Sequence, residues 1–169
     1  MKIRKKDGSW KEIIYNEKQL FQYALNRLGE REFSRAELLK KMKRLQPDES
    51  MINPILDKME EMNYLSDARR ARNILLQYQH KEGLSKLRQR LAAKGIAKQT
   101  MEDVFQEENV GDPEDELYKA IQLLVKKFKV YDKENNNKMY RFLVSKGYSS
   151  QSTSKALKKF SSGELEIDY

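Results

Sequence analysis

Apolar side chains recur every three or four residues along most of the chain, which is the spacing of one face of an α-helix. The first stripe begins near Glu17, continues from Leu20 to Leu28 and ends at Gly29, a residue type that often terminates helices. Eight further stripes follow, separated by glycine, proline or capping residues. The pattern therefore predicts nine helices and an all-α fold.

Capping residues predict where two of these helices begin. Ser34 and Glu37 have the spacing of a capping box, in which each side chain bonds the other residue's backbone N–H. Asp112-Pro113 places a cap directly before a proline at the first helical position, and acidic residues follow in the first turn. Both patterns match the electrostatics of a helix amino terminus.

Two other helix starts are less direct. Pro54 fits its helix if Asn53 is the cap and the proline is the first helical residue; otherwise the helix is kinked. Gly83 interrupts the chain, and Ser85 is the expected cap of the helix that follows.

The first sixteen residues differ from the helical remainder. Asp7-Gly8 lies between Ile3 and Trp10, and this dipeptide between extended-type residues is typical of a hairpin turn. We expect a short N-terminal β-hairpin, which needs to dock because an isolated hairpin is only marginally stable in water.

Three segments of the chain resemble one another. Leu38, Leu87 and Met139 begin similar clusters of apolar and basic residues at offsets of 49 and 52 residues, and Lys94-Gly95-Ile96 falls on Lys146-Gly147-Tyr148. Self-similarity of this kind is typical of stacked structural units. Each unit alone would bury too little apolar surface, so we expect three tandem three-helix repeats in an elongated, curved arrangement.

The predicted organisation has five parts. They are an N-terminal arm or hairpin (1–16), three-helix repeats at 17–65, 66–110 and 111–160, and an acidic tail (161–169).

Glycine recurs at the same place in the second and third repeats. Gly95 and Gly147 each follow a lysine and precede an apolar residue, the pattern of a helix that ends on a left-handed residue. Ile96 and Tyr148 are expected to fold back onto the helices they leave. A β-branched side chain at Gly95 should cost about 1–2 kcal/mol in backbone strain.

Composition limits the chemistry of the 169-residue chain. Its net charge is +8, which favours polyanions or acidic protein surfaces as partners. Cysteine is absent and His80 is the sole histidine, which leaves no thiolate site and makes zinc improbable. We expect no cofactor and no metal. No apolar run suits a signal peptide or a membrane span, so the expected location is the cytoplasm.

We infer that nearly all of the excess positive charge lies in residues 66–98, which hold nine Lys or Arg and two Asp or Glu. Lys86, Arg90 and Lys94 recur every four residues and should line one side of a helix whose other side is apolar. Such a row suits phosphates or an acidic groove, although a solvated helix face has the same pattern. Tyr140-Arg141-Phe142 could stack bases, but Phe142 also fits the core.

No catalytic constellation stands out. His80 stands beside Lys81 near a helix end, where a cation suits the helix dipole. The acids after Asp112 could suggest a magnesium site, but their position at a helix start explains them. The sequence therefore predicts a protein that is not an enzyme.

Four motifs, in order, resemble the RecX family of bacterial RecA regulators. Residues 34–38 match its first repeat, residues 84–96 are close to its central signature, and residues 138–148 are similar to its third-repeat signature, with Lys146 at the place of a common arginine. In residues 64–71, Arg69 and Ala71 match the family pattern, whereas Ser66 replaces an acid and Arg70 an aromatic. The resemblance covers residues 17–160.

The resemblance implies a monomeric, non-enzymatic modulator that binds RecA–DNA filaments, contacts DNA within them, and most often inhibits recombinase and coprotease activity in DNA repair, recombination and the SOS response. The residues expected to face filament or DNA are basic: Arg69, Arg72, Lys86, Arg88, Arg90, Lys94, Arg141 and Lys146. One alternative is a helical-repeat protein that binds DNA directly through its basic face, using a recognition helix. Another is an inert scaffold without a RecA partner.

Overall fold

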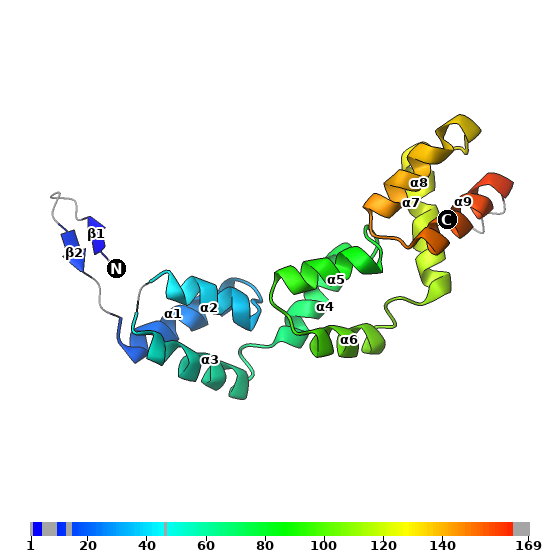
Figure 1. Ribbon diagram of the computed structural model, residues 1–169. Helices are drawn as coiled ribbons and strands as arrows, with labels where there is room; N and C mark the ends of the chain where they lie inside the picture. The colour runs from blue at the N-terminus through cyan, green and yellow to red at the C-terminus, as the bar shows by residue number, and fades with distance from the viewer. Residues whose placement is uncertain (1, 5–9, 13–14, 46, 164–169) are drawn as a thin grey trace. The chain divides into compact units, whose positions relative to one another are not determined.

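The computed structural model describes residues 2–4, 10–12, 15–45 and 47–163 (Figure 1). Over this part of the chain the predicted helical class is confirmed. The helices are α1 (Glu17–Glu30), α2 (Arg35–Lys43), α3 (Ile52–Glu61), α4 (Asp67–Tyr78), α5 (Leu84–Ala93), α6 (Lys98–Glu107), α7 (Pro113–Phe128), α8 (Asn136–Ser145) and α9 (Ser150–Ser162). Short 3-10 turns, η1 (Glu49–Met51) and η2 (Lys133–Asn135), precede α3 and α8.

Two short strands precede the helices. Strand β1 (Lys2–Arg4) pairs antiparallel with β2 (Trp10–Glu12), with Ile3 opposite Lys11. The turn expected at Asp7-Gly8 lies outside the described residues, so the hairpin stays a prediction.

The chain forms two compact units. The first comprises Met1–Asn73 with Ala93–Thr100, and α1, α2 and α3 pack on one another within it. Its core is formed by the apolar stripes of these helices and by their connections: Leu20, Ala24, Phe33, Leu38, Met42, Ile52, Ile55, Leu56, Met59 and Leu65.

The second unit comprises Ile74–Ala92 with Met101–Tyr169, and α7, α8 and α9 pack pairwise within it. Its main core consists of Ala120, Ile121, Leu124, Met139, Leu143, Tyr148, Ala156, Leu157 and Phe160. Phe128 meets Phe142 edge to face, with ring centroids 5.8 Å apart. The division between the units falls within α4, before the last residue of α5 and within α6. The three predicted repeat ranges stay a prediction.

The helix starts agree with the sequence in two places and differ in two. Ser34 and Glu37 form the predicted capping box, and Asp112 caps α7 at the Glu114 and Asp115 N–H groups. Asn53 is not a cap, because α3 already begins at Ile52 after η1. Pro54 therefore lies in the first turn, where the missing N–H has no intrahelical acceptor and no kink is needed.

Ser85 is likewise not a cap, because α5 begins one residue before it, at Leu84. The Leu84 N–H donates to the Glu116 carboxylate over 3.1 Å, and the Gly83 N–H donates to the Lys146 carbonyl over 2.8 Å. Groups distant in sequence therefore satisfy this helix start, which a local pattern does not reveal.

Gly95 and Gly147 adopt the predicted left-handed conformation, with φ of +74° and +94°. The residues after them are buried as expected: Ile96 is 3% exposed and Tyr148 is 4% exposed. A second reason for glycine was not visible in the sequence. A Cβ at Gly95 would lie 2.3 Å from the Ala36 Cβ, and one at Gly147 would lie 2.5 Å from the Lys86 Cβ.

The two lysine–glycine turns make the same contact in both units. In the first unit, the Ser34 hydroxyl at the start of α2 donates to the Lys94 carbonyl. In the second, the Gly83 N–H at the start of α5 donates to the Lys146 carbonyl. The partners are offset by 49 and 52 residues, the same offsets as in the sequence similarity. The repeated motif thus corresponds to a repeated tertiary contact.

Gly95→Ala and Gly163→Ala form a matched pair that tests this contact. Both glycines have positive φ, but nothing lies within 4 Å of a Cβ at Gly163. Gly163→Ala should lower the free energy of unfolding by about 1–2 kcal/mol from strain alone. Gly95→Ala should cost about 1–3 kcal/mol more through overpacking against Ala36. Urea denaturation measures both, and equal losses would contradict the contact.

Candidate functional site

The predicted basic row begins on α5, and Arg90 in it is engaged within the protein. Its guanidinium binds both oxygens of Glu82, with Nη2 2.6 Å from Oε1, and lies 3.8 Å from the centroid of the Tyr78 ring. Glu82 is 6% exposed, and its hydrogen bond from Arg90 holds the pKa of this carboxyl below its usual value against the effect of burial. Arg90 therefore neutralises a buried acid.

Lys94 follows the end of α5 and belongs to a cluster around Glu37 in the first unit. The Glu37 carboxylate lies 3.0 Å from Lys94 Nζ, 3.0 Å from Arg70 Nε and 3.5 Å from Arg31 Nη2. It also accepts the Ser34 N–H as part of the capping box. Burial alone would raise the pKa of Glu37, but these hydrogen bonds and charges lower it to about 2. Lys94 thus fixes the start of α2 with both its carbonyl and its ammonium group.

Three further predicted residues also interact within the chain. Arg69 Nε lies 3.1 Å from Glu32, and its other nitrogens bind Asn63. Arg88 binds both oxygens of Glu102 at 3.1 and 2.9 Å. Arg72 is half-buried on α4 and is also engaged in an interaction.

Arg141, Lys146 and Lys86 are in a different situation. Arg141 is exposed on α8 and has no ion pair within residues 15–45 and 47–163. Lys146 Nζ lies 5.7 Å from the Phe142 ring centroid and is likewise without an ion pair in those ranges. Lys86 Nζ donates to the Ser145 carbonyl over 2.9 Å. The structure brings Lys86, Arg90 and Lys146 together near Glu82, whose pKa is influenced by all three.

The inference that nearly all of the excess positive charge lies in residues 66–98 was wrong, and many of the cations in that segment are not available for binding. The acids that pair with this segment lie partly outside it, at Glu32, Glu37 and Glu102. Residues 126–160 hold ten Lys or Arg and only two Asp or Glu, a net charge of +8 and a larger excess. A running charge count along the whole chain would have found this second segment.

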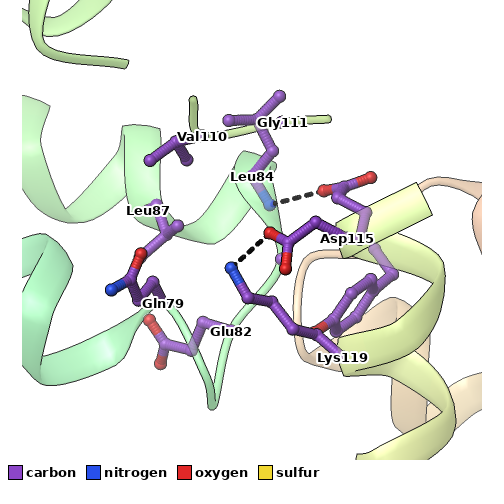
Figure 2. A pocket seen from close by; sticks show the side chains of 11 residues that line it. Gln79, Glu82, Leu84, Leu87, Val110, Gly111, Asp115 and Lys119 are labelled. Carbon is purple, nitrogen blue, oxygen red and sulfur yellow. Dashed lines mark hydrogen bonds and ion pairs between the residues drawn. The ribbon is translucent and has the colours of Figure 1, made fainter. Parts of the chain in front are cut away.

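A small cavity in the second unit lies between the start of α5, the first turns of α7 and Tyr148 (Figure 2). Its volume is about 10 Å³, room for a single water molecule at most. The Tyr148 hydroxyl is buried there without a hydrogen-bond partner among the described residues, and burial raises its pKa, with Asp115 and Glu116 adding to the effect. A cavity of this size has a packing role and holds no organic substrate.

The acids at the start of α7 have local structural roles. Glu116 accepts a hydrogen bond from the Leu84 N–H, and Asp115 lies 2.5 Å from Lys119 Nζ (Figure 2). Glu116 also accepts a hydrogen bond from the Ser152 hydroxyl over 3.2 Å. In the described ranges no three His, Cys, Asp or Glu side chains converge as metal ligands. Within the same ranges, every helix is too short or too polar to cross a bilayer.

Sequence and structure comparisons both find similarity to regulatory proteins named RecX. No protein-family model matches the chain. The regulatory protein RecX of Mannheimia succiniciproducens is 31% identical over 134 residues, which cover 76% of this chain and 85% of that protein. The regulatory protein RecX of Deinococcus radiodurans is 30% identical over 133 residues, which cover 76% of this chain and 62% of that protein. A crystal structure of RecX from Lactobacillus salivarius shares the fold, with a TM-score of 0.73, 20% identity, and coverage of 85% of this chain and 96% of that chain.

Glu37→Gln tests the charge cluster in the first unit through its pH dependence. Glutamine keeps the capping box but removes the charge. Because the folded pKa of Glu37 is about 2 against an ordinary 4.5, its ionisation stabilises the fold above about pH 4.5, and the effect is lost as pH falls toward 2. The stability gap between wild type and variant, up to about 3 kcal/mol, should shrink over that window in denaturant titrations. A gap that stays constant from pH 7 to pH 2 would contradict the assignment.

Arg90→Gln and Arg141→Gln compare the stability effect of a cation that binds a buried carboxylate with that of an exposed cation. Arg90→Gln should lower the free energy of unfolding by about 1–3 kcal/mol, because it leaves the buried Glu82 carboxylate without its main partner. Arg141→Gln should change it by less than about 0.5 kcal/mol, as is usual for an exposed side chain. Chemical denaturation of the two variants decides the point; equal effects would mean that the ion pair contributes nothing.

Proposed function

Because the chain belongs to the RecX family of regulatory proteins, we propose that it binds RecA–DNA filaments and inhibits their recombinase and coprotease activities. The observation that carries this proposal is the 31% identity to a regulatory protein RecX over 85% of that protein's length. The protein would act in the cytoplasm, as a monomer without catalysis of its own, in DNA repair, recombination and the SOS response.

The distribution of charge supports a partner that is large and repetitive. Exposed basic side chains occur in both compact units, for example Lys58 and Lys98 in the first and Lys138 and Arg141 in the second. A filament presents the same acidic or phosphate groups many times, so several weak contacts on one chain add up to useful affinity. A small, compact partner would offer no such multiplicity.

The eight basic residues named from the sequence are the proposed contacts with the filament. They differ in whether an internal carboxylate already binds them. Arg141 and Lys146 have no ion pair within residues 15–45 and 47–163, so they can bind an anion without breaking an ion pair in those ranges. Arg90 and Lys94 already bind Glu82 and Glu37. Charge reversal at these two residues would therefore report on stability as much as on binding.

Co-sedimentation with recombinase filaments tests the proposal. The wild-type protein should pellet with RecA assembled on single-stranded DNA, at low ratios to recombinase, and should slow ATP hydrolysis by the filament. Arg141→Gln/Lys146→Gln should weaken both effects more than the matched pair Arg44→Gln/Lys18→Gln, in which both cations are exposed on the first unit.

Bare DNA at equal nucleotide concentration serves as the control for this experiment. Pelleting with bare DNA as efficiently as with the filament would contradict the proposal and favour the alternative, a protein that binds DNA directly. Absence of any effect on filament ATP hydrolysis would contradict it as well.

A further inference from the structure

The last three helices of the second unit carry a set of cations that the protein does not neutralise. The C-terminal cations are Lys126, Lys127, Lys129, Lys133, Lys138, Arg141, Lys146, Lys155, Lys158 and Lys159. Nine of the ten are exposed and Lys146 is half-buried. None has an ion pair with a carboxylate in the described ranges, in contrast to Arg69, Arg88, Arg90 and Lys94.

The two acids within this segment do not compensate for the charge. Asp132 caps η2, where its carboxylate accepts the Glu134 N–H over 2.9 Å and the Asn135 side-chain amide. Glu134 is exposed and has no ion pair with a described cation. Residues 126–160 therefore present nearly their whole net charge of +8 to solvent or to a partner.

Two lysines lie beside Phe142 on α8, and a third contacts the end of the same helix. Lys127 Nζ, from the end of α7, lies 4.0 Å from the Phe142 ring centroid, and Lys146 Nζ lies 5.7 Å from it. Lys86 Nζ, from α5, binds the carbonyl of Ser145 on the same helix. The first two ammonium groups are thus within about 10 Å of each other, close to the Debye length at 0.1 M salt, and their fields reinforce one another.

Helix electrostatics account for only part of this set. Lys126 and Lys127 lie in the last turn of α7, and Lys146 is the C-cap of α8; cations are favoured at such positions. Lys138 lies in the first turn of α8, a position where the helix dipole disfavours a cation and where the turn itself holds no acid. The helix dipole therefore does not account for this lysine.

We propose that the C-terminal cations, among them Lys127, Arg141 and Lys146, bind the phosphodiester backbone of DNA. The inference rests on the proposed function, in which this DNA is the strand held in the filament. Nine of the ten residues are lysines, a residue type depleted in protein–protein interfaces. Interfaces with DNA are far more positively charged, and Lys contacts to phosphate position the protein without reading sequence.

Fluorescence anisotropy with labelled single-stranded and duplex oligonucleotides tests the inference without recombinase. The test variant is Lys127→Gln/Arg141→Gln/Lys146→Gln, and the matched control is Lys18→Gln/Lys40→Gln/Arg44→Gln. Like the test variant, the control removes two lysines and one arginine, but from exposed positions in the first unit. These three control residues likewise have no ion pair within the described ranges. Circular dichroism melts show whether each variant is folded.

The wild-type protein should bind both oligonucleotides at low salt, with an affinity that falls as salt rises. Each phosphate contact contributes about 0.9 to the logarithmic salt slope on duplex and about 0.7 on single strands. The test variant should therefore bind at least tenfold more weakly and have a slope flatter by about 2–3, whereas the control should stay within about threefold of wild type. Absence of wild-type binding, or equal losses in the two variants, would overturn the inference.

The filament assay separates this inference from the proposed function. Wild-type protein that fails to pellet with recombinase filaments would contradict the proposed function alone, because anisotropy involves no recombinase. A test variant that keeps wild-type affinity for DNA would overturn the inference alone; if it also lost filament binding, the C-terminal cations would contact an acidic protein surface instead.

Discussion

In each compact unit, one hydrogen bond joins the two sequence segments that form it: a lysine carbonyl accepts from the start of an earlier helix, next to a glycine that lets two backbones approach. It joins Ser34 to Lys94 in the first unit and Gly83 to Lys146 in the second. Because the glycines combine positive φ with close approach, no other residue fits either turn without strain. Helices that each bury little apolar surface thereby gain a fixed neighbour.

This contact also determines which cations are available for binding. In the first unit, the Lys94 ammonium group binds the Glu37 carboxylate, which also pairs with Arg70 and Arg31. Where the second unit closes, Lys146 lies near the Phe142 ring, and Arg90 binds both carboxylate oxygens of Glu82. Pairing of partly buried charges stabilises the fold, while exposed cations without a carboxylate keep their field for an external anion. A lysine or arginine therefore stabilises the fold where a carboxylate lies within reach, and stays available for an external anion where none does.

The sequence predicted much of the local structure and less of the site. The spacing of apolar residues predicted the helices, and the glycines at 95 and 147 predicted the left-handed turns. The start of α5 could not be found, because its N–H groups bind Glu116 and Lys146, more than thirty residues away. The basic row was over-weighted for a similar reason: Glu32, Glu37 and Glu102 pair with Arg69, Lys94 and Arg88 from other parts of the chain. Ion pairs of this kind are tertiary contacts, and local charge counts do not contain them.

The Gly83 amide offers the most direct test of the turn contact, because its N–H donates to the Lys146 carbonyl over 2.8 Å at a buried position. Native-state hydrogen exchange by NMR reports on this single bond. The account predicts that the Gly83 amide exchanges as slowly as that of Leu143, in the core of α8, through opening of the whole unit. Exchange of Gly83 at the rate of an unstructured peptide, with Leu143 still protected, would contradict it.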